Sequence, residues 1–176
     1  MGIYRDQHVA QLFFAPLVQS VGLMTRGEKI CAFIERFVLI PEGAHVGQPM
    51  KLMPFQRKFV LAVYDNPQGS SRAYLSVARK NGKSALIAAI LLAHLVGPEA
   101  KQNSQIISGA RSRDQAALAF KLAEKMVRLS PNLSKIIRIV PSQKMINCSV
   151  SYNAIFLTAV FLYFHYFSSL FVCKRF

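Results

Sequence analysis

The chain has 176 residues, 52% of them hydrophobic, and its 22 Lys and Arg against 8 Asp and Glu give a net charge of +14. So much apolar sequence excludes a wholly disordered protein, and the length suits one domain or a piece of something larger. The three cysteines and four histidines lack the spacing of a zinc site or a disulfide framework. The basic surplus predicts an anionic partner, which means nucleic acid, nucleotide or an acidic membrane surface.

Hydrophobic periodicity and stop signals predict alternating helices and strands along the chain. The pattern indicates helices over 28–39, 55–64, 84–96 and 112–129, and strands over 73–78, 105–108 and 136–140. Pro54 can open the second helix because the first turn does not use its missing N–H. Ser112 and Gln115 have the spacing of a capping box at the start of the fourth. This alternation predicts an α/β fold with a parallel sheet.

A candidate phosphate loop lies between the predicted strand 73–78 and the helix 84–96. Its sequence is Arg79-Lys80-Asn81-Gly82-Lys83-Ser84. In a P-loop, backbone N–H groups surround the phosphates, the lysine reaches the β- and γ-phosphates, and the hydroxyl holds Mg²⁺. The start of the following helix adds N–H donors and a favourable dipole. Val77 stands where the full motif has glycine, so the segment is either a variant P-loop or only a helix cap.

Three segments together resemble the large subunit of tailed-bacteriophage terminases. They are Pro54-Phe55-Gln56-Arg57-Lys58-Phe59, Ala78-Arg79-Lys80-Asn81-Gly82-Lys83-Ser84, and Ser108-Gly109-Ala110 leading into Ser112-Arg113-Asp114-Gln115-Ala116-Ala117. In that family the large subunit is the DNA-packaging motor, with an N-terminal P-loop ATPase and a C-terminal nuclease. The resemblance implies an incomplete P-loop NTPase domain over 28–146, after an N-terminal extension at 1–27 and before an apolar tail at 147–176.

The resemblance implies that the chain is a fragment of a packaging motor, from a phage or a degraded prophage, that binds ATP and Mg²⁺. Gln56 matches the family's adenine-sensing glutamine, since an amide can both donate to and accept from the adenine edge. Arg79 matches the loop arginine that acts in cis on the γ-phosphate. The expected ATP site is completed by Asn81, Gly82, Lys83 and Ser84, with Ser84 on Mg²⁺. The family also implies double-stranded DNA, the small terminase subunit and the portal as partners, in the host-cell cytoplasm.

Other groups that such a motor needs are missing from the sequence. No Asp-Glu pair occurs anywhere, so nothing supplies the carboxylates that hold Mg²⁺ through water and activate the attacking water. The carboxylate-rich nuclease domain is also missing. We therefore expect the 176-residue chain to be inactive as an ATPase on its own.

The C-terminal tail differs from the rest of the chain, because residues 145–173 contain no Asp, Glu, Lys or Arg. One explanation is a lost reading frame in a remnant gene. The other is a membrane anchor, since 154–173 is long enough to cross a bilayer as a helix and Lys174 and Arg175 follow it. Frame loss is favoured because a DNA motor needs no anchor. In both cases we expect an apolar helix.

Two other functions fit parts of the sequence. Gln56 and the loop also suit another nucleic-acid-dependent P-loop ATPase of the helicase type. The basic charge and the tail suit a small membrane-anchored protein without catalytic activity. An Asp-Glu strand and a carboxylate-rich domain encoded downstream in another frame would favour the terminase interpretation over both.

Overall fold

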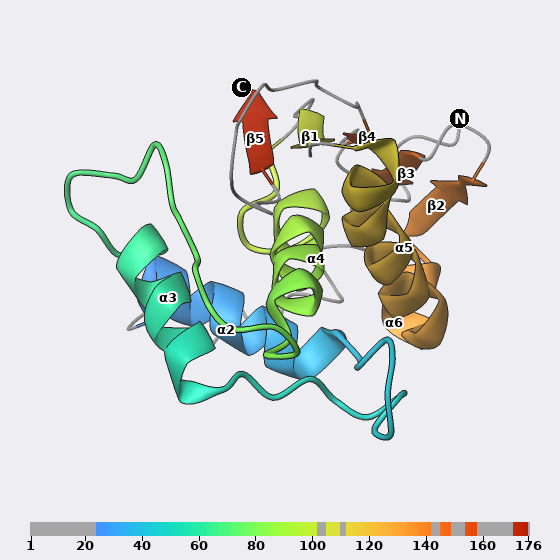
Figure 1. Cartoon of the computed structure of the whole chain (residues 1–176), viewed down its shortest axis with the longest axis horizontal. Helices are drawn as coiled ribbons and strands as arrows, with labels where there is room; N and C mark the ends of the chain where they lie inside the picture. The colour runs from blue at the N-terminus through green and yellow to red at the C-terminus, as the bar shows by residue number, and fades with distance from the viewer. Residues whose placement is uncertain are drawn as a thin grey trace, which may run out of the picture.

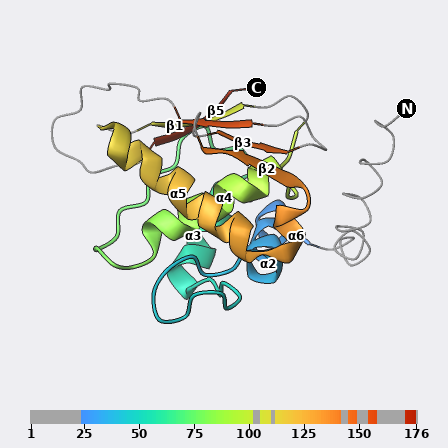
Figure 2. The same cartoon turned by 90° about the vertical axis from the view of Figure 1, so that its right-hand side faces the viewer.

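The described strands form one sheet, and the described helices lie on one side of it (Figure 1 and Figure 2). The computed structural model describes residues 24–101, 105–109, 112–141, 145–148, 154–157 and 171–175. The helices are α2 (Arg26–Phe37), α3 (Pro54–Tyr64), α4 (Lys83–Leu95), α5 (Arg113–Leu129) and α6 (Pro131–Ser134). The strands are β1 (Gln105–Gly109), β2 (Ile137–Val140), β3 (Met145–Cys148), β4 (Ala154–Leu157) and β5 (Phe171–Arg175).

Helix α4 lies at the centre of the core. Its sequence KSALIAAILLAHL is apolar on almost every face, so it must be covered from several sides. Helices α2 and α5 and strand β4 all contact it. The largest buried side chains in this core are Phe33, Ile30, Ile34, Leu86, Leu91, Leu92, Leu95, Ile106, Met126, Leu133 and Ile146.

The four predicted helices are confirmed, with ends shifted by at most two residues. α2 begins earlier than predicted because Thr25 caps it: Glu28 N donates to Thr25 Oγ1 at 3.2 Å, and Thr25 N donates to Glu28 Oε2 at 2.8 Å. This reciprocal pair lies outside the apolar stripe from which the helix was predicted. At α5, Gln115 N donates to Ser112 Oγ at 3.2 Å, so Ser112 is the N-cap.

The prediction of a parallel sheet is wrong for most of the pairings. The strand order is β2-β3-β4-β1-β5, and only β1 and β4 pair in parallel. The other three pairs, β1 with β5, β2 with β3 and β3 with β4, are antiparallel. Connections as short as 141–144 and 149–153 can join only antiparallel strands, whereas the long segment containing α5 separates β1 from β4.

The predicted strand at 73–78 is also absent from the sheet, and this segment has no regular secondary structure. Its sequence AYLSVA has the composition of a buried strand, but a strand needs a hydrogen-bonded neighbour. Both sides of β1 are occupied, by β4 on one side and β5 on the other. Leu75 is instead partly buried against the hydrophobic core.

The predicted C-terminal helix is wrong for the residues that the structure describes. Ala154–Leu157 and Phe171–Arg175 are strands, and residues 158–170 lie outside the described part of the chain. A short apolar run does not distinguish a strand from a helix by periodicity, and pairing with β1 decides between them here. Among the described residues, no helix is both long and apolar enough to cross a membrane.

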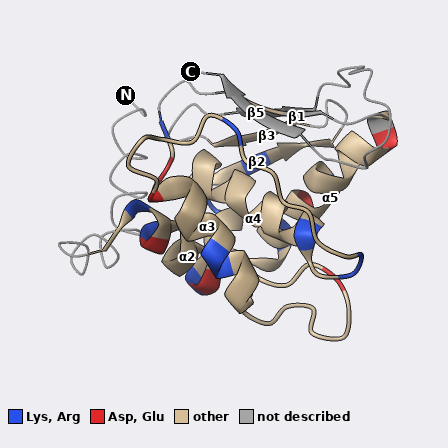
Figure 3. Ribbon diagram, turned by 60° about the vertical axis from the view of Figure 1, so that its left-hand side comes forward, with Lys and Arg blue, Asp and Glu red and all other residues tan. Residues whose placement is uncertain are grey.

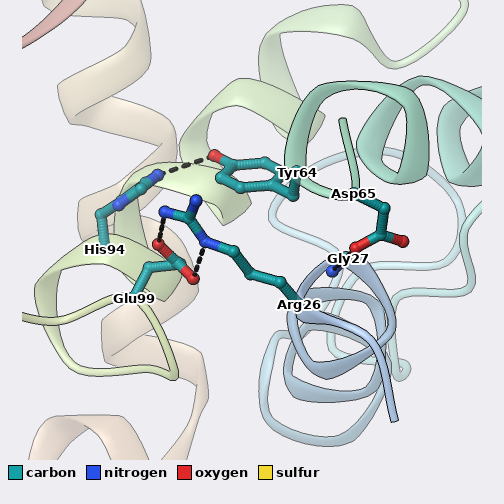
Figure 4. A network of polar contacts seen from close by, with 6 residues as sticks. All are labelled: Arg26, Gly27, Tyr64, Asp65, His94 and Glu99. Carbon is teal, nitrogen blue, oxygen red and sulfur yellow. Dashed lines mark hydrogen bonds and ion pairs between the residues drawn. The ribbon is translucent and has the colours of Figure 1, made fainter. Parts of the chain in front are cut away.

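An ion pair joins the start of α2 to the segment after α4 (Figure 4). Arg26 Nε donates to Glu99 Oε1 at 2.6 Å, and Arg26 Nη2 donates to Glu99 Oε2. The Glu99 side chain is only 8% exposed, whereas that of Arg26 is 55% exposed. Hydrogen bonding to the Glu99 carboxylate raises the pKa of Arg26. The guanidinium also lies 5.6 Å from the centre of the Tyr64 ring.

The end of α3 belongs to the same cluster. Tyr64 Oη and His94 Nε2 are 2.7 Å apart, which connects α3 to the last turn of α4. Burial, together with the nearby carboxylate of Glu99, raises the pKa of Tyr64 above its usual value. Asp65 accepts from Thr25 Oγ1 at 2.7 Å and from Gly27 N at 2.6 Å. Three helix ends are therefore joined by polar contacts.

We expect Arg26→Met to lower the free energy of unfolding by about 1–3 kcal/mol, because it removes two hydrogen bonds to a buried carboxylate. Arg128→Met is the matched control, since Arg128 pairs at 2.8 Å with Glu124 on α5 and its side chain is 60% exposed. That change is expected to cost less than about 0.5 kcal/mol. Urea unfolding measures both, and equal losses would contradict a structural role for the Arg26–Glu99 pair.

Candidate functional site

The loop at 79–82 has an unusual backbone. Lys80 has φ +66° and Gly82 has φ +67°, both in the left-handed region. Glycine adopts this conformation freely, but a lysine there costs on the order of 1–3 kcal/mol. Turns that contain left-handed residues can direct several backbone N–H groups into one concavity, which suits an anion.

Helix α4 begins directly after this loop with no side chain capping it. The first helical hydrogen bond runs from Leu86 N to Gly82 O at 2.9 Å. The N–H groups of Lys83, Ser84 and Ala85 therefore precede the helical ladder, at the end of the helix that carries partial positive charge. These groups provide donors beside the Lys83 ammonium.

Two side chains of the loop and helix start donate hydrogen bonds to the segment before the loop. Lys83 Nζ donates to Val77 O at 3.4 Å, and Asn81 Nδ2 donates to Ala78 O at 3.3 Å. The Lys83 side chain thus connects the start of α4 to the backbone six residues earlier. Val77 stands where the full phosphate-loop motif has glycine, and in this structure its carbonyl serves as the acceptor for the loop lysine.

Gln56 of α3 lies directly against the loop. The residue is 3% exposed; its Oε1 accepts from Met53 N at 3.1 Å, and its Nε2 donates to Asn81 O at 3.3 Å. A Cβ atom added to Gly82 would lie 3.1 Å from Gln56 Nε2. A side chain at residue 82 would therefore press on the Gln56 amide, in addition to being strained by the left-handed backbone there.

The structure brings together most of the residues predicted for the ATP site: Gln56, Asn81, Gly82 and Lys83. Ser84 is half-buried in the first turn of α4, and Arg79 is exposed in the turn before Gly82. Two features were not predicted, the left-handed Lys80 and the Val77 carbonyl that Lys83 contacts. Nothing in the sequence signals either one, because both depend on the backbone path.

The family is decided by comparison with known proteins. Residues 54–156 match the model of the family described as "Terminase large subunit, ATPase domain". The chain belongs to this family. The match includes Gln56, the whole loop, α4 and β1, and it continues into β4.

Two comparisons with one phage protein agree with this assignment. The chain is 62% identical over 135 residues to the terminase large subunit of Enterobacteria phage HK97, which is 75% of this chain and 27% of the relative. The crystal structure of the HK97 large terminase superposes with a TM-score of 0.72 at 57% identity, covering 77% of this chain and 28% of that one. The terminase-like chain thus spans about a quarter of the length of this relative.

We expect Gly82→Ala to lower the stability of this terminase-like domain by more than Gly47→Ala does. Both glycines have positive φ, so each alanine meets a left-handed penalty of about 1–2 kcal/mol. Only at Gly82 does the new Cβ also meet a neighbour, since nothing lies within 4 Å of the Cβ position at Gly47. Urea unfolding of the two variants measures the difference, and identical losses would show that the contact with Gln56 is unimportant.

Proposed function

We propose that this terminase ATPase-domain chain binds ATP with Mg²⁺ through the loop at 79–84. The proposal rests chiefly on one observation, the uncapped start of α4 beside the left-handed turn and the Lys83 ammonium. Helix starts with free N–H groups and a neighbouring lysine are well suited to phosphate. The family description, an ATPase domain, supports the same assignment.

The donor set fits a triphosphate. In our proposal Lys83 leaves the Val77 carbonyl and donates to the β- and γ-phosphates, while the first N–H groups of α4 hold the remaining oxygens. The Ser84 hydroxyl supplies one oxygen ligand for Mg²⁺, which commonly keeps several waters in such sites. Mg²⁺ held there would neutralise part of the phosphate charge. Arg79, exposed in the turn, is free to approach the γ-phosphate from the solvent side.

We further propose double-stranded DNA as the macromolecular partner, with the small terminase subunit and the portal as the protein partners expected for the family. The net charge of +14 supports DNA binding, because Lys and Arg that neutralise backbone phosphates release counterions. Figure 3 shows Lys and Arg on several helices and on the loops between them. A distribution of this kind suits contacts to the DNA backbone without reading its sequence.

We expect Lys83→Ala to abolish binding of Mg·ATP to the 176-residue chain, measured by isothermal titration calorimetry. The change removes the ammonium that donates to Val77 O across the loop turn. Lys121→Ala is the matched control, because it removes one charge from the exposed face of α5 and leaves the loop unchanged. Equal affinity of the wild-type chain and Lys83→Ala would contradict the proposed site.

The acidic residues that the structure describes are used elsewhere in the fold. Each of six makes a hydrogen bond or ion pair away from the loop: Glu28 with Thr25, Glu35 with Arg57, Glu42 with Lys125, Asp65 with Gly27, Glu99 with Arg26, and Glu124 with Arg128. Asp114 lies in the first turn of α5, where a negative charge stabilises the helix start. We therefore assign none of them to the activation of water.

We expect the 176-residue chain to bind ATP without sustained turnover. Help from a general base alone is commonly worth about 10²–10⁴-fold in rate, and no described carboxylate is placed to give it. A phosphate-release assay in the presence of duplex DNA measures the rate. Turnover near the common enzyme median of about 10 s⁻¹, lost in Lys83→Ala, would contradict this expectation and show that a carboxylate of the chain activates water.

A further inference from the structure

We infer that Lys80 is a specificity-determining residue of the phosphate loop, whose ammonium binds the terminal phosphate of ATP and so favours ATP over ADP. The inference rests on the proposed function of the loop. It adds a residue to which the resemblance to terminases assigns no role, and it states which part of the nucleotide that residue recognises.

The backbone at Lys80 is strained. Among the described residues, Lys80 is the only one other than glycine with a positive φ, which is +66°. This left-handed conformation puts Cβ too close to the following carbonyl oxygen, whereas glycine adopts it without steric cost. A glycine at residue 80 would therefore form the same turn at lower energy. The turn does not need the lysine side chain, so its presence has to be explained by another contact.

That contact is not made within the described part of the chain. The Lys80 side chain is exposed, and its ammonium makes no hydrogen bond or ion pair with another described residue. The other lysine of the loop differs, since Lys83 is half-buried and donates to Val77 O at 3.4 Å. Lys80 thus holds its charge in solvent, where a ligand can reach it.

The positive charge around Lys80 is not neutralised by neighbours in the sequence. Residues 66–98 contain four Lys and Arg, three of them within 79–83, and no Asp or Glu. Asp65 and Glu99, the acids on either side of this stretch, belong to the cluster in Figure 4 at the opposite end of α4. Helix α4 is about 20 Å long, which is well beyond contact distance. Like charges this close repel one another, and a ligand with several negative charges relieves the repulsion.

The donors along the loop would bind different phosphates. In the proposed site, Lys83 and the first N–H groups of α4 hold the phosphates nearest the helix. Lys80 precedes these donors in the loop and is exposed, so its ammonium meets the ligand where the ligand faces solvent. ATP has its γ-phosphate at this end, whereas ADP ends one phosphate earlier. An ammonium that contacts only the γ-phosphate therefore adds affinity for ATP and not for ADP.

Lys80→Gln tests this contact, because glutamine removes the positive charge and meets the same left-handed strain. We expect isothermal titration calorimetry of the 176-residue chain to show Mg·ATP binding weakened about 3- to 10-fold and Mg·ADP binding weakened less than about 2-fold. Lys121→Gln is the matched control, since it removes one charge from the exposed face of α5 and is expected to change neither affinity.

The two affinities distinguish a contact with the terminal phosphate from other roles of Lys80. Equal losses for Mg·ATP and Mg·ADP would overturn the inference, because the contact would then lie on a phosphate that both nucleotides share. Unchanged affinities for both would also overturn it, and a loss of duplex DNA binding in the same variant would assign Lys80 to DNA. A wild-type chain that binds neither nucleotide would overturn the proposed function of the loop, and this inference with it.

Lys80→Gly provides a second measurement, made on the folded chain without ligand. It removes the ammonium and the strain together, so we expect a higher urea midpoint than for the wild-type chain, with the same loss of Mg·ATP affinity as in Lys80→Gln. A more stable variant that binds ATP less well would show that the lysine serves the ligand and not the turn. A midpoint no higher than that of Lys80→Gln would overturn the argument from strain, and with it the inference.

Discussion

The burial of α4 is the constraint on which the rest of the structure depends. A helix that is apolar on nearly every face has no stable position at a surface, so α2, α5 and the sheet must surround it. Ile87 and Ile90 in its middle are half-buried, and its polar residues lie at its two ends. Its N-terminal end carries the candidate phosphate loop, and its C-terminal end carries His94 and leads to Glu99. Packing of the apolar faces of α4 therefore places the polar groups of this region at the two ends of the helix.

Helix α3 contacts both ends of α4 through polar side chains. Its first turn contributes Gln56, which donates to the loop carbonyl of Asn81. Its last residue, Tyr64, contacts His94 in the last turn of α4. The two helices therefore run in the same direction, and the distance between these contacts is set by the length of each helix. A shift of α3 along its axis would disturb the loop and the cluster in Figure 4 together.

The helices and the loop were predictable because their signals are local. Proline at the start of α3, Ser112 before α5 and the sequence Gly82-Lys83-Ser84 each act within a few residues. The strands were less predictable, because pairing depends on what lies beside them. The segment 73–78 has the composition of a strand but does not pair with β1, whereas the C-terminal tail contributes β4 and β5, both of which do.

The candidate site, too, could be predicted only in part. The residue types at 82–84 predict a phosphate loop, and the resemblance to terminases correctly indicated the family. The internal contacts of Gln56 and Lys83 could not be predicted, since each ends on a backbone carbonyl, of Asn81 and Val77. Carbonyl groups are present at every residue, so no sequence pattern marks the one that a side chain will reach.

The pairing of β1 with β5 has a consequence for the folding kinetics. Gln105 pairs with Arg175, so this ladder closes over a loop of about 70 residues, whereas β2 and β3 are joined by a short hairpin. Closing a long loop costs more chain entropy, and folding slows as contacts become more distant in sequence. The helices and the β2–β3 pair are therefore expected to form early, and β1 is expected to pair with β4 and β5 later. During that interval its unpaired edge is the part of the chain most exposed to association with other molecules.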